Sequence, residues 1–215
     1  MTGLLLKDLL NLKRMTKQYV LILGAMCVWS VMMKNPSFIS MYTVLCTAMM
    51  VPSSFTYDEY AQFDKYALTM PLTRRALVKE KYLLLLLLVG GGMALGTMIS
   101  VFINCFIRED VLELVGTGVV MGSLFLLVYS IIIPLIYKWG AEKARMIMVM
   151  VYLGLFGAVY GVVWLVKRGS FSLWPAGLSE GQLMAVLVGG ALAITLVALA
   201  VSYRVSMEII KRKEY

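Results

Sequence analysis

Six long apolar segments without a charged side chain divide this 215-residue chain, and they constrain its fold more than any other feature. Because a bilayer core of about 30 Å needs roughly 20 apolar residues in a helix that crosses it, each segment has about the length of a membrane span. The first is the shortest and reaches only about 24 Å at ~1.5 Å per residue, a length that snorkelling lysines on both sides can extend. The sequence therefore predicts an all-α polytopic membrane protein, a single transmembrane domain 1–215, with six spans at residues 18–33, 38–57, 82–107, 114–137, 146–166 and 183–203.

The composition excludes an ordinary soluble domain and places the charges at helix ends. The chain is 61% hydrophobic and 15% charged, and its mean hydropathy is +0.86. Because basic residues in short loops stay on the cytoplasmic side, their distribution predicts that both termini are cytoplasmic. The net charge of +8 is spread over these helix ends, so no nucleic-acid partner is expected. Of the 20 Lys and Arg residues, those on the opposite side are Lys34, Arg108, Lys167 and Arg168.

Residues 1–17 have the pattern of an amphipathic helix. Leu5, Leu9 and Leu12 recur at helical spacing, while Lys7 and Arg14 lie on another face. The segment lacks the small-residue cleavage site of a signal peptide. We therefore expect an interfacial helix in the headgroup layer, which either anchors the chain or contacts a cytoplasmic partner.

The sequence lacks the residues that several kinds of chemistry require. The three cysteines, Cys27, Cys46 and Cys105, fall in different spans, and the chain has no histidine, so neither a metal site nor a disulfide framework is indicated. The spans hold no ionisable residue for ion coupling or intramembrane hydrolysis, although backbone carbonyls at a broken helix could still bind sodium. There is also no G-x-x-x-x-G-K-[ST] loop, so this chain is not expected to be an enzyme that hydrolyses ATP.

Small residues and prolines occur within the predicted spans. Prolines near the cytoplasmic ends of the second and fourth spans, Pro52 and Pro134, are expected to kink them. Three small-xxx-small pairs predict close helix packing, either within the chain or at a subunit interface. The pairs are Gly92 and Gly96, Gly118 and Gly122, and Gly157 and Gly161.

A dense polar insert separates the second and third spans. Thr56 and Glu59 fit a capping box and Pro71 ends helical geometry, so the pattern predicts a short helix over residues 56–70. Its aromatic face either lies on headgroups or enters a groove of a soluble partner, and its acidic residues favour a protein partner. The polar face holds Asp58, Gln62, Lys65 and Thr69, and the apolar face holds Tyr60, Phe63, Ala67 and Met70, with Tyr66 alongside.

A second helix is expected to start after Pro71, with Thr73 as its cap. Arg74 and Arg75 then oppose the helix dipole, which suggests that they and Lys79 have another task at the interface. Lipid phosphates, acidic groups of a partner and ordinary positive-inside anchoring all remain open as that task.

Two stretches carry a family resemblance: "LLLKDLLNLKR", Leu4 to Arg14, and "DEYAQFDKYALTMPLTRRALVKEKYL", Asp58 to Leu83. They resemble the permease subunits of ABC-2 type exporters, especially the small six-helix permeases of bacterial systems that export phenol-soluble modulins, other peptides and bacteriocins. The likeness covers essentially the whole chain. Two departures put the subfamily more than the family in doubt: the family usually has Leu at the position of Met70 and often Trp at that of Phe63.

The resemblance implies a type V exporter fold in the bacterial plasma membrane, with helix 56–70 as a coupling helix on a separate ATPase. Two ATPase subunits, which hold ATP and Mg, would pair with two permease copies or with this chain and a paralogue. The cargo would be an amphipathic peptide, a bacteriocin or another hydrophobic molecule, which the 17 methionines would suit. The residues implied to contact the ATPase are Asp58, Glu59, Tyr60, Phe63, Asp64, Tyr66 and Met70.

Two functions of other classes account for the same spans and the same cytoplasmic helix. One is a membrane immunity or scaffold protein that binds a partner without transport. The other is a secondary transporter driven by an ion gradient.

Overall fold

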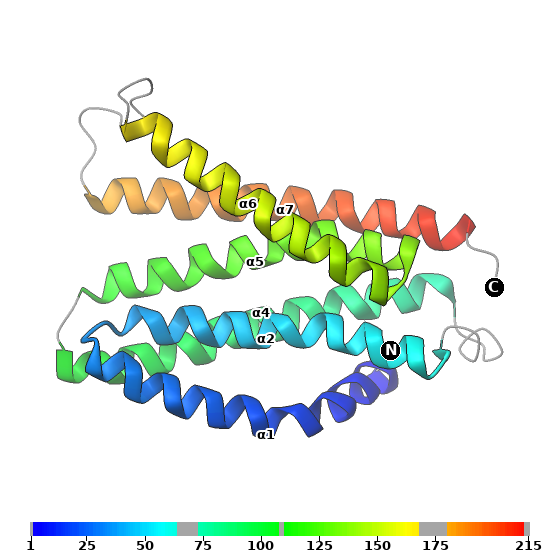
Figure 1. The fold of residues 1–215 in the computed structure, drawn as a ribbon, viewed down its shortest axis with the longest axis horizontal. Helices are drawn as coiled ribbons and strands as arrows, with labels where there is room; N and C mark the ends of the chain where they lie inside the picture. Colours follow the sequence, from blue (N-terminus) through cyan, green and yellow to red (C-terminus); the bar gives the residue numbers. More distant parts are fainter. Residues whose placement is uncertain (1, 64–72, 108–109, 168–179, 213–215) are drawn as a thin grey trace.

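The computed structural model describes residues 2–63, 73–107, 110–167 and 180–212, and these form a bundle of long helices (Figure 1). No strand occurs in these ranges, so the prediction of an all-α fold is confirmed. The helices are α1 (Thr2–Met32), α2 (Ser37–Tyr60), α4 (Arg74–Ile107), α5 (Val111–Trp139), α6 (Ala141–Lys167) and α7 (Glu180–Arg212).

Five candidate membrane spans confirm that the chain is a multi-pass membrane protein. The sixth predicted span, residues 146–166, lies within α6, which is not among the five, and it stays a prediction. The five are Met15–Met32, Ser37–Tyr60, Arg75–Ile107, Leu114–Trp139 and Val188–Arg212.

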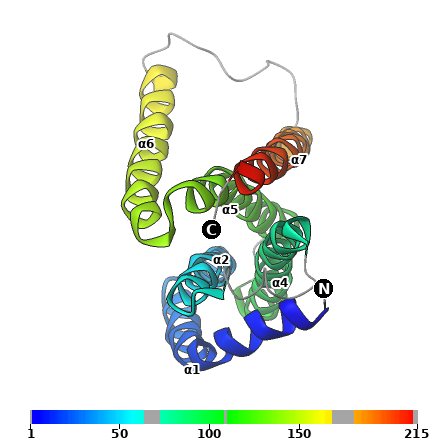
Figure 2. The same ribbon diagram turned by 90° about the vertical axis from the view of Figure 1, so that its right-hand side faces the viewer.

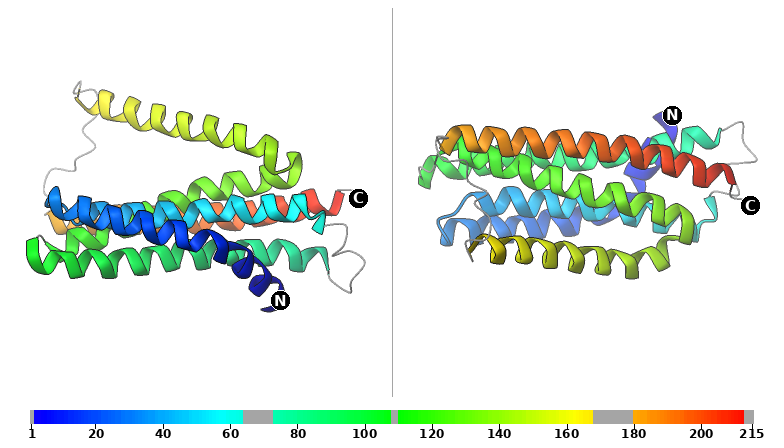
Figure 3. Two further views of the ribbon diagram at one scale, coloured as in Figure 1. Left: turned by 60° about the horizontal axis from the view of Figure 1, so that its bottom comes forward. Right: turned by 90° about the horizontal axis from the view of Figure 1, so that it is seen from above.

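The helices α2, α4, α5 and α7 form the packed part of the bundle. Helix α2 packs along α4, and α5 packs along α7, while α6 turns back from the end of α5 and diverges from the other helices (Figures 2 and 3). The starts of α1, α4 and α6 and the ends of α2, α5 and α7 lie at one end of the bundle (Figure 1). This end carries most of the basic residues and is called here the basic end.

Two predicted helix boundaries are wrong. The amphipathic segment and the first span are joined in one curved helix, α1, because no proline interrupts them and the hydroxyl of Thr16 donates within the helix, to the carbonyl of Leu12 at 3.2 Å (Figure 3). Thr56 does not cap a new helix either: its hydroxyl donates to the carbonyl of Pro52 at 2.9 Å, inside α2. Helix α2 continues to Tyr60 and ends in a turn in which Gln62 has a φ of 46°. Of the predicted helix 56–70, residues 64–70 lie outside the described residues.

Glycines mark the closest approaches between helices in the bundle. A Cβ added at Gly96 would lie 3.1 Å from the backbone of Ser40, so α4 and α2 are almost in backbone contact there. Cβ atoms added at Gly118 and Gly122 would also collide with side chains of neighbouring helices, those of Ser40, Thr97 and Met93. Gly157 and Gly161 on α6 have nothing within 4 Å, so they serve no packing between the described helices of one chain.

Replacing Gly92 by alanine is expected to lower stability by about 1–3 kcal/mol, because the added methyl group overpacks the α2–α4 contact. Its Cβ would lie 2.0 Å from Oγ1 and 3.0 Å from Cβ of Thr47, whose hydroxyl is already bonded to the carbonyls of Thr43 and Val44. The neighbouring Gly91→Ala is the matched control, since nothing lies within 4 Å of its Cβ. Thermal unfolding in detergent micelles measures the stability of the two variants, and equal unfolding midpoints for Gly92→Ala and Gly91→Ala would contradict the prediction.

Candidate functional site

Five charged residues meet near the basic end of the bundle, and we call them the ion cluster. They come from three helices that are far apart in sequence: the start of α1, the end of α2 and the start of α4. All but one are nearly inaccessible, and Lys7 is the partly exposed member. The residues are Lys7, Asp8, Asp58, Glu80 and Lys81.

Lys81 is the centre of the cluster. Its Nζ lies 2.6 Å from Oδ2 of Asp8 and 2.5 Å from Oδ2 of Asp58, and it donates to the hydroxyl of Ser54 at 2.7 Å. An ammonium group has three N–H donors, so these three partners use all of them. Lys81 on α4 therefore joins α1 and α2 through one buried atom.

Lys7 closes the cluster from its outer side. Its Nζ lies 2.5 Å from Oδ1 of Asp58 and 3.1 Å from Oδ1 of Asp8, so each carboxylate lies between two ammonium groups. The same Nζ lies 3.5 Å from the ring centroid of Phe63, a cation–π contact. This contact connects the ion cluster to the first residue after the turn that ends α2.

The electrostatics keep Asp8 ionised. Burial alone would raise the pKa of its carboxyl group, but a hydrogen bond from Glu80 and the charges of the two lysines lower that pKa to about 2. Two aspartates and two lysines of the cluster lie within ion-pair distance of one another. Removing one partner from such a group leaves an uncompensated buried charge, which costs about 3–5 kcal/mol.

Helical spacing explains why these charges face inward. Asp8 lies four residues before the buried Leu12, and Asp58 lies three residues after the buried Phe55. Lys81 lies three residues after Val78, which is also buried. Because side chains three or four residues apart share a helix face, the charges lie on the packed faces of their helices and meet there.

Glu59, beside the cluster, connects α2 to α6. Its Oε2 accepts a hydrogen bond of 2.6 Å from the backbone N–H of Ala141, the first residue of α6. The carboxylate thus satisfies a helix N-terminus and complements its dipole. Gly140 makes the turn before it with a φ of 85°, and a Cβ there would lie 2.8 Å from Oε1 of Glu59.

Replacing Glu59 by alanine is expected to cost roughly 1 kcal/mol, the usual loss for a helix cap. The matched control is Glu142→Ala, which removes an exposed carboxylate from the first turn of α6 without breaking the bond to Ala141. Chemical unfolding in micelles measures the free energy of unfolding of both variants. If Glu142→Ala loses more stability than Glu59→Ala, negative charge near the helix N-terminus, and not the bond to Ala141, stabilises this end of α6.

The predicted ATPase-contacting residues have different environments in the structure. Asp58 is buried in ion pairs and Glu59 caps α6, whereas the Tyr60 side chain is 72% exposed and Phe63 is half-buried under Lys7. Tyr60 therefore offers the accessible aromatic surface at this end of α2. The predicted contact residues Asp64, Tyr66 and Met70 lie outside the described residues.

The predicted interfacial basic residues lie at the start of α4. Arg74 is its first residue, and Arg75 and Lys79 are exposed. Within the described ranges, no group of three or more His, Cys, Asp or Glu side chains could hold a metal ion. The ion cluster has the geometry of a connection between three helices.

Similarity to a known protein family identifies the class of this protein. A family described as ABC-2 family transporter protein matches residues 3–211, a range that includes every residue of the ion cluster. Neither the curated proteins nor the solved structures give a match. The match spans nearly the whole chain, as the resemblance of its two characteristic stretches implies, and the protein belongs to the ABC-2 family of transporter proteins.

Proposed function

We propose that this protein is the permease subunit of an ATP-driven exporter, which moves an amphipathic peptide or another hydrophobic cargo out of a bacterial cell. A separate ATPase subunit supplies the energy and holds the ATP and Mg. Family membership supports the role in transport, because ABC-2 permeases generally work with an ABC ATPase. The observation that carries the coupling mechanism is the ion cluster directly beside the exposed Tyr60.

In this mechanism the ATPase docks at the end of α2, on Tyr60, Phe63 and the segment that follows. Asp58 lies two residues before Tyr60 and is bonded to Lys7 of α1 and Lys81 of α4. A rigid displacement of the end of α2 therefore carries α1 and α4 with it. Glu59 transmits the same displacement to the start of α6. Helices that move as packed units are a common form of switching transition.

A second permease copy, or a paralogue, completes the transporter in this proposal, with two ATPase subunits below. Helix α6 supports this stoichiometry, because several of its described apolar side chains are exposed. Met150, Leu153 and Tyr160 are each more than two-thirds exposed, and Gly157 and Gly161 leave room for a close approach. The basic end faces the cytoplasm, since it carries most of the lysines and arginines.

Co-expression with candidate ABC ATPases tests the proposal. We expect a stable complex whose rate of ATP hydrolysis changes when the permease is present. If reconstituted vesicles instead transport under an ion gradient without ATP, the protein is a secondary transporter. If it binds a toxin or a kinase but moves nothing and recruits no ATPase, it is an immunity or scaffold protein.

A further inference from the structure

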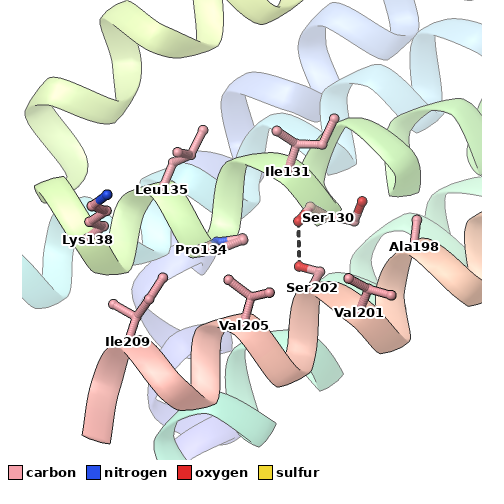
Figure 4. A pocket seen from close by; sticks show the side chains of 10 residues that line it. All are labelled: Ser130, Ile131, Pro134, Leu135, Lys138, Ala198, Val201, Ser202, Val205 and Ile209. Carbon is pink, nitrogen blue, oxygen red and sulfur yellow. Dashed lines mark hydrogen bonds between the residues drawn. The ribbon is translucent and has the colours of Figure 1, made fainter. Parts of the chain in front are cut away.

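An open groove with a volume of about 560 Å³ lies between α5 and α7, and no residue of the ion cluster is among those that line it (Figure 4). Its volume is within the range of small-molecule sites, about 300–1,000 Å³. Its walls are almost entirely apolar. The side chains that form them include Ile131, Pro134, Leu135, Val201, Val205 and Ile209.

Pro134 explains how the two helices are joined beside the groove. Because proline has no N–H, the carbonyl of Ser130 lacks its usual helical partner. The hydroxyl of Ser202 on α7 donates to this carbonyl instead (Figure 4). Two turns earlier, the hydroxyl of Thr195 is shared between the carbonyl of Ala191 at 2.7 Å and that of Ser123 at 3.2 Å. The contact with Ser123 has the same sequence offset of 72 residues. The helices therefore run parallel in fixed register, which makes the groove a built feature of the fold.

The lining favours an occupant without hydrogen-bonding groups. The hydroxyl of Ser130 donates to the carbonyl of Leu127 at 2.6 Å, and the proton of Ser202 is used on Ser130. The oxygen of Ser202 is paired too, with the hydroxyl of Tyr82 at 2.5 Å. An extended peptide backbone in this groove would leave its N–H and C=O groups unpaired at membrane depth, which costs several kcal/mol per group, whereas an acyl chain has none to pair.

The groove is also accessible from the surrounding bilayer. Ile131 is 50% exposed and Val201 is 57% exposed, so the groove opens along the side of the bundle. A lipid can enter it laterally without crossing a polar region. The lipid chain itself gains little, however, because the bilayer is as apolar as the groove. The headgroup must therefore determine which lipid the groove binds.

Among the described residues that line the groove, Lys138 is the one cation, and it lies at the end of the groove (Figure 4). It is exposed in the last turn of α5, at the end of the candidate span Leu114–Trp139, and thus at the level of lipid headgroups. Its Nζ lies 5.2 Å from the ring of Trp139. Within the part of the chain that the structure describes, no ion pair involves Lys138. An ammonium group above an apolar groove matches an anionic phospholipid, whose phosphate lies directly above its chains.

We propose that this groove is a binding site for an anionic phospholipid, with one acyl chain along Pro134 and Val205 and the phosphate on Lys138. The site does not depend on the proposed exporter function. Bound lipid fills the space between α5 and α7 at their basic ends.

Quenching of Trp139 fluorescence by brominated lipids tests the site in the full-length chain. The variant Trp29→Phe, Trp164→Phe, Trp174→Phe keeps Trp139 as its fluorophore and is reconstituted in phosphatidylcholine vesicles. At the same small fraction of brominated lipid, phosphatidylglycerol is expected to occupy the site about fivefold more than phosphatidylcholine. This ratio is the expected effect of one lysine near the membrane surface on the binding of an anionic lipid. Equal quenching by the two lipids would overturn the proposal.

Three variants of this single-tryptophan protein identify the groove and its cation. Lys138→Gln is expected to abolish the preference for phosphatidylglycerol, whereas Lys143→Gln, an exposed lysine on the nearby start of α6, preserves it. Val205→Phe fills the groove and is expected to lower quenching by both lipids. The proposal is overturned if Lys138→Gln keeps the preference, if Lys143→Gln loses it equally, or if soluble glycerol phosphate competes as well as the lipid does. A cooperative unfolding transition in each variant shows that it is folded.

Discussion

Replacing Lys81 by methionine is expected to destabilise the protein by about 3–5 kcal/mol, because it leaves two carboxylates buried with one ammonium group between them. Lys81 is 5% exposed and is bonded to Asp8, Asp58 and Ser54. The change leaves the volume of the side chain nearly the same, so packing alone does not account for a loss of this size. For a chain of this length, thermal unfolding in micelles would show a fall in midpoint on the order of 10 °C.

Lys79→Met provides the control, since Lys79 is an exposed lysine two residues earlier in α4. It is expected to change stability by roughly 0.5 kcal/mol or less. The double variant Lys81→Met, Asp58→Asn removes a cation and an anion together and is expected to recover part of the loss, with a coupling energy of about 0.5–3 kcal/mol. If Lys81→Met is as stable as Lys79→Met, or if the second change adds a full further loss, the cluster does not act as one unit.

The sequence predicts the positions of the described long helices well, because each apolar run is much longer than a turn and lacks charge. The boundaries are less predictable where a polar pattern follows such a run. Thr56 and Glu59 have the spacing of a capping box, but that pattern needs a break in the helix before Thr56. No break occurs after Pro52, and the Thr56 hydroxyl bonds within α2 instead. A local capping pattern alone does not show that a helix has ended.

The ion cluster is the part of the site that the sequence reading missed, although a signal for it is present. Asp8 interrupts an apolar run, yet it lies three residues after Leu5 and four before Leu12, on the apolar face of α1. Lys81 has the same relation to Val78 and Leu85. A charge on the apolar face of a helix predicts a buried partner. Which partner it meets depends on packing between helices, and that information is not local.

Replacing the exposed Tyr60 by aspartate is expected to weaken the complex with the ATPase subunit about thirtyfold, the ratio that corresponds to roughly 2 kcal/mol for a central interface tyrosine. The prediction rests on the proposed function. Tyr60 is 72% exposed, so the substitution removes an apolar contact without opening the core. The unfolding midpoint of the permease should stay nearly constant. The measurement is the affinity between purified permease and ATPase, together with the rate of ATP hydrolysis in the complex.

Leu112→Asp is the control for this experiment, because Leu112 is 63% exposed in the first turn of α5, at the opposite end of the bundle (Figure 1). It introduces the same charge and should leave both the affinity and the rate unchanged. Glu59→Ala separates docking from transmission: it keeps Tyr60 but breaks the bond to Ala141, so binding should persist while stimulation of ATP hydrolysis falls. If Tyr60→Asp binds and stimulates as the parent does, the end of α2 is not the docking site. Membership of the transporter family would still hold, and the partner surface would then have to be sought elsewhere on the basic end of the bundle.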